Sequence, residues 1–433
     1  MMNREYVSEL FDKFIRDIAV RIHIDVVTYD IFHNEISQYK THKIGKNYCM
    51  NIVECNDVFM MYTDKISPNL HYCEDIIDTI VHKFDLIVVS KTEMKVLCYL
   101  ERANIYTSDK YNTIDVCFDT YKIYKNYIGV YHIIFVYNNT QYCCTKKNIF
   151  ILSDNKTVND MLKPYLFDGS ESVKHFVIIN AKLKKILCHE YNETKFCHTT
   201  DKNVILIKEE LADATVKFYD KPLYFSCLDE LLFEIEELSL ENEISRKLSS
   251  AGYILMNDCE KIVIENTTYR KINDSIPDYQ NVHMCYLDLY KSDKLNEILP
   301  YMSNYYMDIV KRINISMKTM AKEILNIYHL TRNKDNIGLY TCLPNSYKKM
   351  LYDLHKIFIE ERDREFKTDD DNRKSVSVDD VYHYLKRISN TQLFNVYSER
   401  NELIKNLSSF KIYNDVVYID CIDTKTQTEL MFV

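Results

Sequence analysis

Glycine, proline and tryptophan are scarce in this sequence, with 5, 6 and 0 residues among 433. So few glycines leave no G-x-G-x-x-G or G-x-x-x-x-G-K motif, which excludes the glycine-rich phosphate cradles of dinucleotide-binding and P-loop proteins. The depleted residues use GC-rich codons, whereas tyrosine is abundant with 36 residues. This coding bias indicates a very AT-rich genome, such as that of a cytoplasmic plasmid or a large DNA virus.

An excess of basic residues is also lacking. The net charge of -9 and the pI near 5.9 argue against a general, charge-driven nucleic-acid binder, although local basic clusters could still bind one particular RNA. No apolar run reaches membrane-spanning length, and the start MMNREYVSELFDKF is charged and amphipathic, unlike a secretory leader. The 14 cysteines form no C-x-x-C pair, so reduced thiols in a cytoplasmic protein are expected.

The 46% apolar content is enough for two or three domains with proper cores. Residues 1–20 have helical spacing, and β-type runs follow from Ile22 to about Tyr142, including IHIDVVTYDIF and YHIIFVY. Asn138-Asn139 predicts a hairpin turn between two of these strands. Alternating strands continue to about residue 275.

Helical spacing appears within the strand-rich part at Leu228–Leu248 and dominates after Pro277. Apolar stripes there include Ile313, Met317 and Ile324, and a later helix is predicted around Tyr384. The final run FKIYNDVVYIDCI predicts a hairpin with Asn-Asp at its turn. The order is therefore a strand-rich body, a helical domain and a short β tail.

Four strand segments resemble, in order and spacing, the motifs of covalent nucleotidyltransferases, most closely the T-even phage type of tRNA-repairing RNA ligase. KNYIGVYHIIFVYNNTQYCCTKKNI at 125–149 is similar to the K-x-D-G motif, with Asn126 at the lysine position and Ile128 at the aspartate position. FVI at 176–178 has Val177 in place of the glutamate of F-E-F. The later counterparts of E-G-x-V and K-x-K carry the remaining changes, at Ala251, Val263 and Glu265.

The resemblance implies an α+β fold with three parts. These are an antiparallel β body of the nucleotidyltransferase (ATP-grasp-like RNA ligase) type over 1–275, a helical carboxy-terminal domain over 278–400 and a short β tail over 401–433. TYDIFHNEISQY at 28–39 resembles the family's amino-terminal strand segment, and the helical domain resembles the part that the family uses for tRNA.

The chemistry of the resembled family should be lost here. A lysine amine must attack the α-phosphate of ATP, carboxylates must hold a divalent metal, and lysines must neutralise the triphosphate. The matching positions have neutral side chains or, at Glu265, a negative one. Use of the neighbouring Lys125 would need a one-residue register shift, which turns the side chain to the opposite face. We therefore expect no catalytic residue, no cofactor and no metal, and interpret the chain as a pseudoenzyme.

The expected ligand is RNA, such as tRNA or cleaved tRNA, and an immunity role against an anticodon-nuclease ribotoxin follows by analogy with phage repair ligases. The ribotoxin itself is then a second possible partner, and no membrane is involved. Basic and aromatic residues around the former pocket are the expected RNA contacts. They are Tyr142, Lys146, Lys147, Lys182, Lys184, Lys185 and Tyr269.

Two other functions stay open: an interaction or structural protein of a virus or plasmid that kept the ligase fold without RNA binding, and an active nucleotidyltransferase that uses Lys125. Isolated signals have simpler explanations. The pairs Cys188-His189 and Cys197-His198 could ligate zinc, but neighbours on a strand face opposite ways. The run EIEELSLENE is most simply a helix with an acidic outer face, and the lysines near 311–322 a solvated one.

Overall fold

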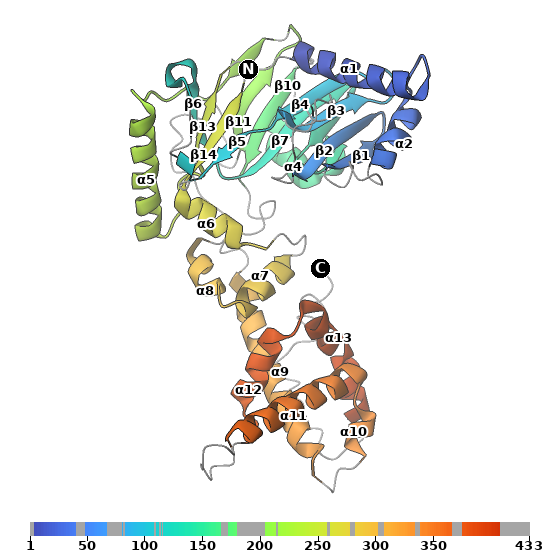
Figure 1. The fold of residues 1–433 in the computed structure, drawn as a ribbon, viewed down its shortest axis with the longest axis vertical. Coiled ribbons are helices and arrows are strands. Elements are labelled where there is room, and N and C mark those ends of the chain that lie inside the picture. The colour runs from blue at the N-terminus through green and yellow to red at the C-terminus, as the bar shows by residue number, and fades with distance from the viewer. Residues whose placement is uncertain are drawn as a thin grey trace. The chain divides into compact units, whose positions relative to one another are not determined.

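The computed structural model describes residues 4–39, 48–66, 80, 83–107, 110–111, 114, 116–165, 172–179, 204–213, 215–257, 260–277, 282–301, 307–333, 338–365 and 375–407. The chain divides into two compact units, Met1–Asn273 and Asp274–Val433. The first unit is rich in antiparallel strands and the second is helical (Figure 1). The protein is therefore a mixed α+β protein.

The described strands of the first unit form three sheets. One has the order β1-β2-β3-β4, with bounds Tyr48–Cys55, Val58–Ile66, Phe84–Ser90 and Val96–Glu101. The second has the order β12-β11-β10-β7-β8-β9, with bounds Val216–Phe218, Val204–Glu210, Val173–Ile178, Val130–Tyr137, Thr140–Cys144 and Ile149–Ile151. The third has the order β5-β14-β13-β6, with bounds Asn104–Tyr106, Lys261–Glu265, Gly252–Met256 and Lys122–Asn126. Only the β14–β5 pair among them is parallel.

Helices cover the outer faces of these sheets (Figure 1). Helices α1 (Arg4–Ile22) and α2 (Tyr29–Tyr39) pack on the first sheet, whose other face shares a core with the six-stranded sheet. Helix α4 (Lys156–Leu162) covers the far face of the six-stranded sheet, and α5 (Leu228–Ser245) covers the third sheet. Burial of one apolar face per layer explains the alternating patterns in the sequence.

The predicted β7–β8 hairpin is confirmed. Tyr137 pairs with Thr140, and the two residues between them, Asn138 and Asn139, have φ of 49° and 59°. Both central residues of a type I′ turn need positive φ, which asparagine tolerates better than other side chains except glycine.

The strand prediction for residues 28–39 is wrong, because this segment is helix α2. Phe32 and Ile36, four residues apart, are buried and belong to the core that α1 provides, with the Phe32 ring 5.8 Å from that of Phe11. Four residues is even as well as nearly one helical turn, so the spacing alone did not separate the two structures.

The second unit contains α7 to α13 among its described residues. Their bounds are Val282–Lys291, Leu295–Ile298, Met307–Leu330, Leu339–Cys342, Asn345–Glu365, Val378–Arg387 and Asn390–Leu407, and α6 (Thr267–Ser275) spans the division between the units. Ser377 and Asp380 form a capping box at the start of α12. Helix α13 continues to Leu407, and the hairpin predicted for 410–422 lies outside the described residues.

An ion pair lies in the core of the second unit. Arg400 of α13 donates from Nε to Glu323 Oε2 at 2.9 Å and from Nη2 to Glu323 Oε1 at 2.6 Å, and each side chain is 1% exposed. Nearby, the hydroxyl of Ser316 donates to that of Tyr397. This bidentate pair joins α9 to α13 and satisfies charges that would otherwise be costly to bury.

None of the described helices is both long and apolar enough to cross a membrane.

Candidate functional site

Three of the positions matched to the ligase motifs, Asn126, Ala251 and Glu265, meet at one end of the third sheet. Asn126 ends β6 and pairs with Gly252, which pairs with Glu265 on β14. The backbone N–H of Ala251 donates to the carbonyl of Asn126 at 2.9 Å, and that of Asn266 donates to the carbonyl of Ala251 at 2.9 Å. Three segments distant in the sequence therefore converge, and none brings a lysine or a metal-binding carboxylate pair to this point.

Two glycines at this place allow close backbone approach. Gly252 has φ of +128°, and a Cβ there would lie 2.0 Å from the carbonyl oxygen of Ile264. A Cβ on Gly129, in the β6–β7 connection, would lie 2.4 Å from Cγ1 of Val177. The absence of a side chain at Gly129 thus lets this connection pack closely against Val177 of β10. Because neither position tolerates a larger side chain, both glycines are required by the geometry.

Apolar side chains surround the Val177 position. Val177, Ile179 and Ile205 form a buried cluster against which Tyr127 and Tyr131 pack. Ile128, matched to the motif aspartate, is 2% exposed. A divalent cation needs oxygen ligands, and the aliphatic side chains of Val177, Ile179 and Ile205 have no oxygen atom to offer.

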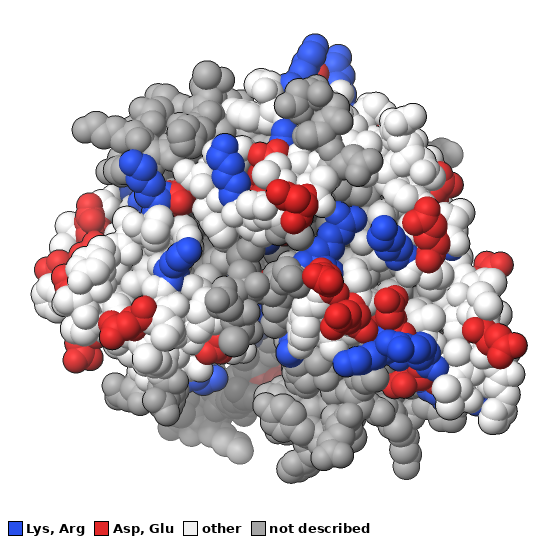
Figure 2. All heavy atoms as spheres, turned by 90° about the horizontal axis from the view of Figure 1, so that it is seen from above, with Lys and Arg blue, Asp and Glu red and all other residues white. Residues whose placement is uncertain are grey.

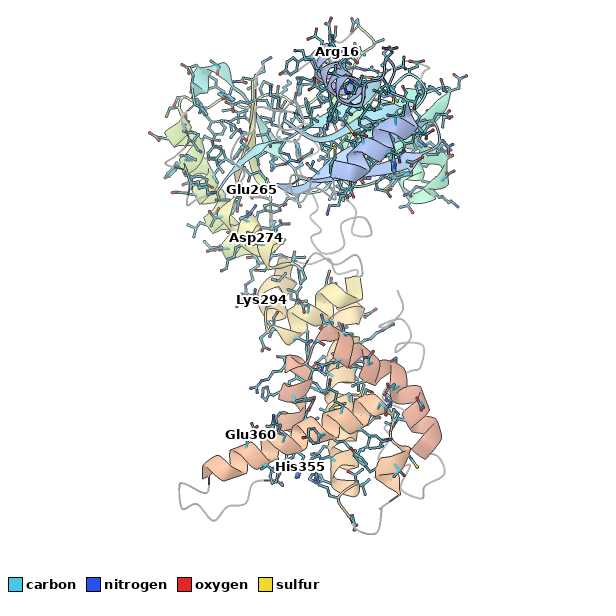
Figure 3. The ribbon with its side chains drawn as sticks, turned by 45° about the vertical axis from the view of Figure 1, so that its right-hand side comes forward. Arg16, Glu265, Asp274, Lys294, His355 and Glu360 are labelled. Atoms are coloured by element: carbon cyan, nitrogen blue, oxygen red, sulfur yellow. The ribbon has the colours of Figure 1, made fainter. Side chains whose placement is uncertain are left out.

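Glu265, the negative side chain among the matched positions, has a basic partner. Its carboxylate accepts from Arg270 Nη1 at 2.9 Å, and Figure 3 shows it at the end of β14 beside α6. Asn266 is fully buried, and its Nδ2 has no hydrogen-bond partner within the described parts of the chain. Strand β14 is therefore followed by an unsatisfied amide and ends in a carboxylate that is neutralised by Arg270.

Lys125 faces away from this place. Its register partner is Tyr253, whereas Asn126 pairs with Gly252 on the other face. Tyr253 belongs to the core beneath α5, where its ring contacts that of Phe225. Since paired residues of a sheet share a face, Lys125 is directed to the side that α5 covers.

A buried polar cluster on the six-stranded sheet was not predicted from the sequence. Lys208 Nζ lies 2.8 Å from Glu210 Oε1 on β11, and His175 Nε2 of β10 lies 3.0 Å from the same oxygen. His175 Nδ1 lies 3.0 Å from the hydroxyl of Tyr131 on β7. A neutral histidine protonated on Nε2 fits both contacts, because Nδ1 can then accept from the tyrosine.

The charges of this cluster shift one another's pKa values. Burial, with repulsion from Lys208, lowers the pKa of His175 to about 4. Burial acts to raise the pKa of Glu210, but the Lys208 ammonium and His175 outweigh it and hold that pKa well below its usual range. At neutral pH the cluster is therefore a Lys⁺–Glu⁻ pair with a neutral histidine beside it.

Further charged side chains extend the cluster toward β3, β4 and β14. Burial lowers the pKa of Lys261, repulsion from Lys208 lowers it further, and the charge of Glu101 opposes this. Arg102 Nε and Lys146 Nζ lie 3.1 and 3.3 Å from the carboxylate of Asp85. Cations and anions are nearly balanced here. Lys208 and Glu210 alternate within VILIKEE, and this is the signal that could have predicted a polar inner face.

The predicted RNA-binding residues are only partly brought together. Tyr142 is 1% exposed and stacks on Phe135 in the core, so no base can stack on its ring; this part of the prediction is wrong. Lys146 and Lys147 are exposed in the β8–β9 turn, and Tyr269 is half-buried on α6. Lys182, Lys184 and Lys185 lie outside the described residues.

Surface charge is mixed on the one face that Figure 2 shows. On the face shown in Figure 2, lysine and arginine side chains are interspersed with acidic ones. On α9, Lys311, Arg312, Lys318 and Lys322 are exposed. The two Cys-His pairs, at 188–189 and 197–198, lie outside the described residues.

Comparison with protein-family models finds no match for this chain, and no curated protein matches it. Solved structures that match include a chain provisionally described as an ATP-dependent DNA ligase from Aquifex aeolicus. It is 10% identical, with a TM-score of 0.31 over 66% of this chain and 79% of that chain. A likeness at this level carries no argument about activity, so the function has to be inferred from the geometry of the site.

Proposed function

We propose that this chain is a catalytically inactive, RNA-ligase-like protein that binds RNA, with tRNA or cleaved tRNA as the expected ligand. The observation that carries the proposal is the convergence of Asn126, Gly252 and Glu265 through adjacent strand pairs. Their order in the sequence suggested that they belong to one former active site, and their adjacency supports that interpretation.

The side chains at this place support the inactive form of the proposal. Adenylation needs an amine nucleophile, and Asn126 has an amide in its place. Val177 and Ala251 provide no metal ligand where the motifs have glutamates. The neighbouring amine, that of Lys125, is on the face that packs beneath α5.

The exposed lysines of the β8–β9 turn support the RNA-binding form of the proposal. Lys147 is exposed beside Lys146, whose side chain is 54% exposed although its ammonium lies 3.3 Å from a carboxylate oxygen of Asp85. With an AT-rich plasmid or virus as the source, protection of tRNA against a ribotoxin is the role that we favour, by occupancy of the cut site or by binding of the toxin. An interaction protein without RNA affinity is the alternative that the binding experiment separates.

Incubation with ATP and magnesium or manganese should leave the protein without a covalent AMP adduct. The physical reason is that Asn126 has an amide in place of the amine, and that Val177 and Ala251 stand where the motifs have glutamates. Intact-mass spectrometry of the full chain checks this, with a known ATP-dependent ligase as positive control. A stable adduct that the Lys125→Ala variant loses would restore the active-enzyme interpretation.

Binding to tRNA should weaken as salt rises, because lysines that bind phosphate release counterions. Replacing Lys146 and Lys147 by alanine should reduce the slope of log K against log salt by about one unit for each lysine that binds a phosphate, and Lys182/Lys184/Lys185→Ala should act likewise. Fluorescence anisotropy with intact and anticodon-nicked tRNA measures these slopes.

The matched control is Lys13→Ala/Arg16→Ala, which removes two exposed charges from α1. This variant should keep the wild-type slope. If all four proteins bind equally weakly and without salt dependence, the lysines are merely solvated and the interaction-protein alternative replaces RNA binding.

A further inference from the structure

Helix α5 has one face fixed against the third sheet. Leu231 and Ile235 are fully buried in the core that includes Tyr253 and Ile264. Asn242 is also buried, and its Oδ1 accepts from the backbone N–H of Ser249. These contacts fix the rotation of the helix about its axis and therefore determine which of its residues face away from the sheet.

The outward face has an apolar stripe. Phe233, Leu240 and Ile244 are 61%, 59% and 76% exposed. At about 100° per residue, these three lie within about 20° of the line directly opposite the buried face. Single exposed apolar residues are ordinary, but a row of three along two turns or more is typical of an interaction surface.

Carboxylates border the stripe on both sides. Helix α5 contains no lysine or arginine. The exposed residues Asp229, Glu236 and Glu243 follow one border of the stripe, and Glu230, Glu237 and Glu241 follow the other. Within the described part of the chain, none of these six makes an ion pair. Six exposed carboxylates that have no ion-pair partner among the described residues therefore lie along one face of α5.

We infer that α5 is a docking surface for a basic amphipathic helix of a partner protein. The apolar stripe matches the apolar face of such a helix, and the flanking carboxylates match lysines or arginines on its borders. Like-charge repulsion excludes α5 of a second copy. This surface is independent of the proposed RNA contacts, so the two can fail separately.

Helix α9 of a second copy of the chain, which has several lysines, is also a poor partner for α5. Among the side chains of α9 that the structure describes, Ile315, at 52% exposure, is the one exposed apolar residue between the exposed lysines. One residue cannot cover a stripe of three. A partner helix with several apolar residues in register is the better match.

The test uses the full chain and a synthetic peptide of about 18 residues with leucines at helical spacing and lysines on both borders. A scrambled peptide of the same composition, which lacks the stripe, is the control probe. We expect the striped peptide to bind at least about tenfold more tightly than the scrambled one, with salt-dependent affinity. Phe233→Gln/Leu240→Gln/Ile244→Gln should remove this preference, and Glu236→Gln/Glu237→Gln/Glu243→Gln should remove most of the salt dependence.

The substituted residues are exposed and glutamine is a good helix former, so both variants should fold like the wild type. Ile315→Gln on α9 is the matched control and should bind as the wild type does. Equal binding of both peptides, no binding at about 1 mM peptide, or unchanged binding by the triple apolar variant would overturn the inference. Sedimentation showing a wild-type dimer that the apolar variant converts to a monomer would identify a second copy as the occupant and overturn it as well.

Discussion

Replacing Arg400 by methionine is expected to destabilise the helical unit by about 3–5 kcal/mol. The change leaves Glu323, 1% exposed, without the two hydrogen bonds that now satisfy both of its carboxylate oxygens. Once the Arg400 cation is lost, the buried negative charge is no longer neutralised and draws water into the core between α9 and α13, which is unfavourable. Hydrogen exchange should therefore show reduced protection in α9 and α13, with the strands of the first unit unchanged.

The double variant Glu323→Leu/Arg400→Met is the informative control. It removes both charges and refills the space with apolar atoms, so most of the stability should return. The difference between the single and double variants isolates the cost of the orphaned charge from that of altered packing. A single variant that loses less than about 1 kcal/mol would mean that water reaches Glu323 in solution.

Local patterns were enough to predict some parts of the fold. The β7–β8 hairpin followed from alternation and from Asn138-Asn139, which form the turn. Motif order suggested that Asn126 and Glu265 belong together, and both pair with Gly252. These features depend on neighbours in sequence or on a spacing that can be compared with a known pattern.

Other features depend on packing that a single sequence does not encode in a readable way. Tyr142 has the same alternation as a surface tyrosine, and its burial follows only from the sheet stacked on that face. The Lys208–Glu210–His175 cluster joins two strands more than 20 residues apart in the sequence, and its partner Tyr131 is on a third strand, β7. Segment 29–39 became a helix because α1 offers an apolar surface to Phe32.

The polar cluster also leads to a prediction about the pKa of His175. Removal of the Lys208 ammonium leaves His175, which is neutral at pH 7, as the basic side chain close to Glu210 among the described residues. In the wild type, Lys208 repels a proton from His175, whereas Glu210 attracts one. The Lys208→Met variant should therefore have a higher His175 pKa, and the histidine should take over part of the lysine's role at mildly acidic pH.

The expected result is a stability loss in Lys208→Met that is larger at pH 7.5 than at pH 5.5. In the wild type the folded pKa of His175, about 4, is below its unfolded value of about 6.5. Its contribution to stability is therefore present above pH 6.5 and is lost as the pH falls toward 4, by about 1 kcal/mol between pH 7.5 and 5.5. In the variant this loss should shrink or reverse, because a protonated His175 can pair with Glu210.

Urea unfolding of the wild type and of Lys208→Met at the two pH values measures the difference in stability between them. Burial also lowers the pKa of His132 to about 4, and this affects both proteins alike. Lys208→Met/Glu210→Gln removes both charges and should leave His175 with a wild-type-like loss on acidification. A gap between wild type and Lys208→Met that does not change with pH would show that His175 stays neutral and that the three side chains are not coupled.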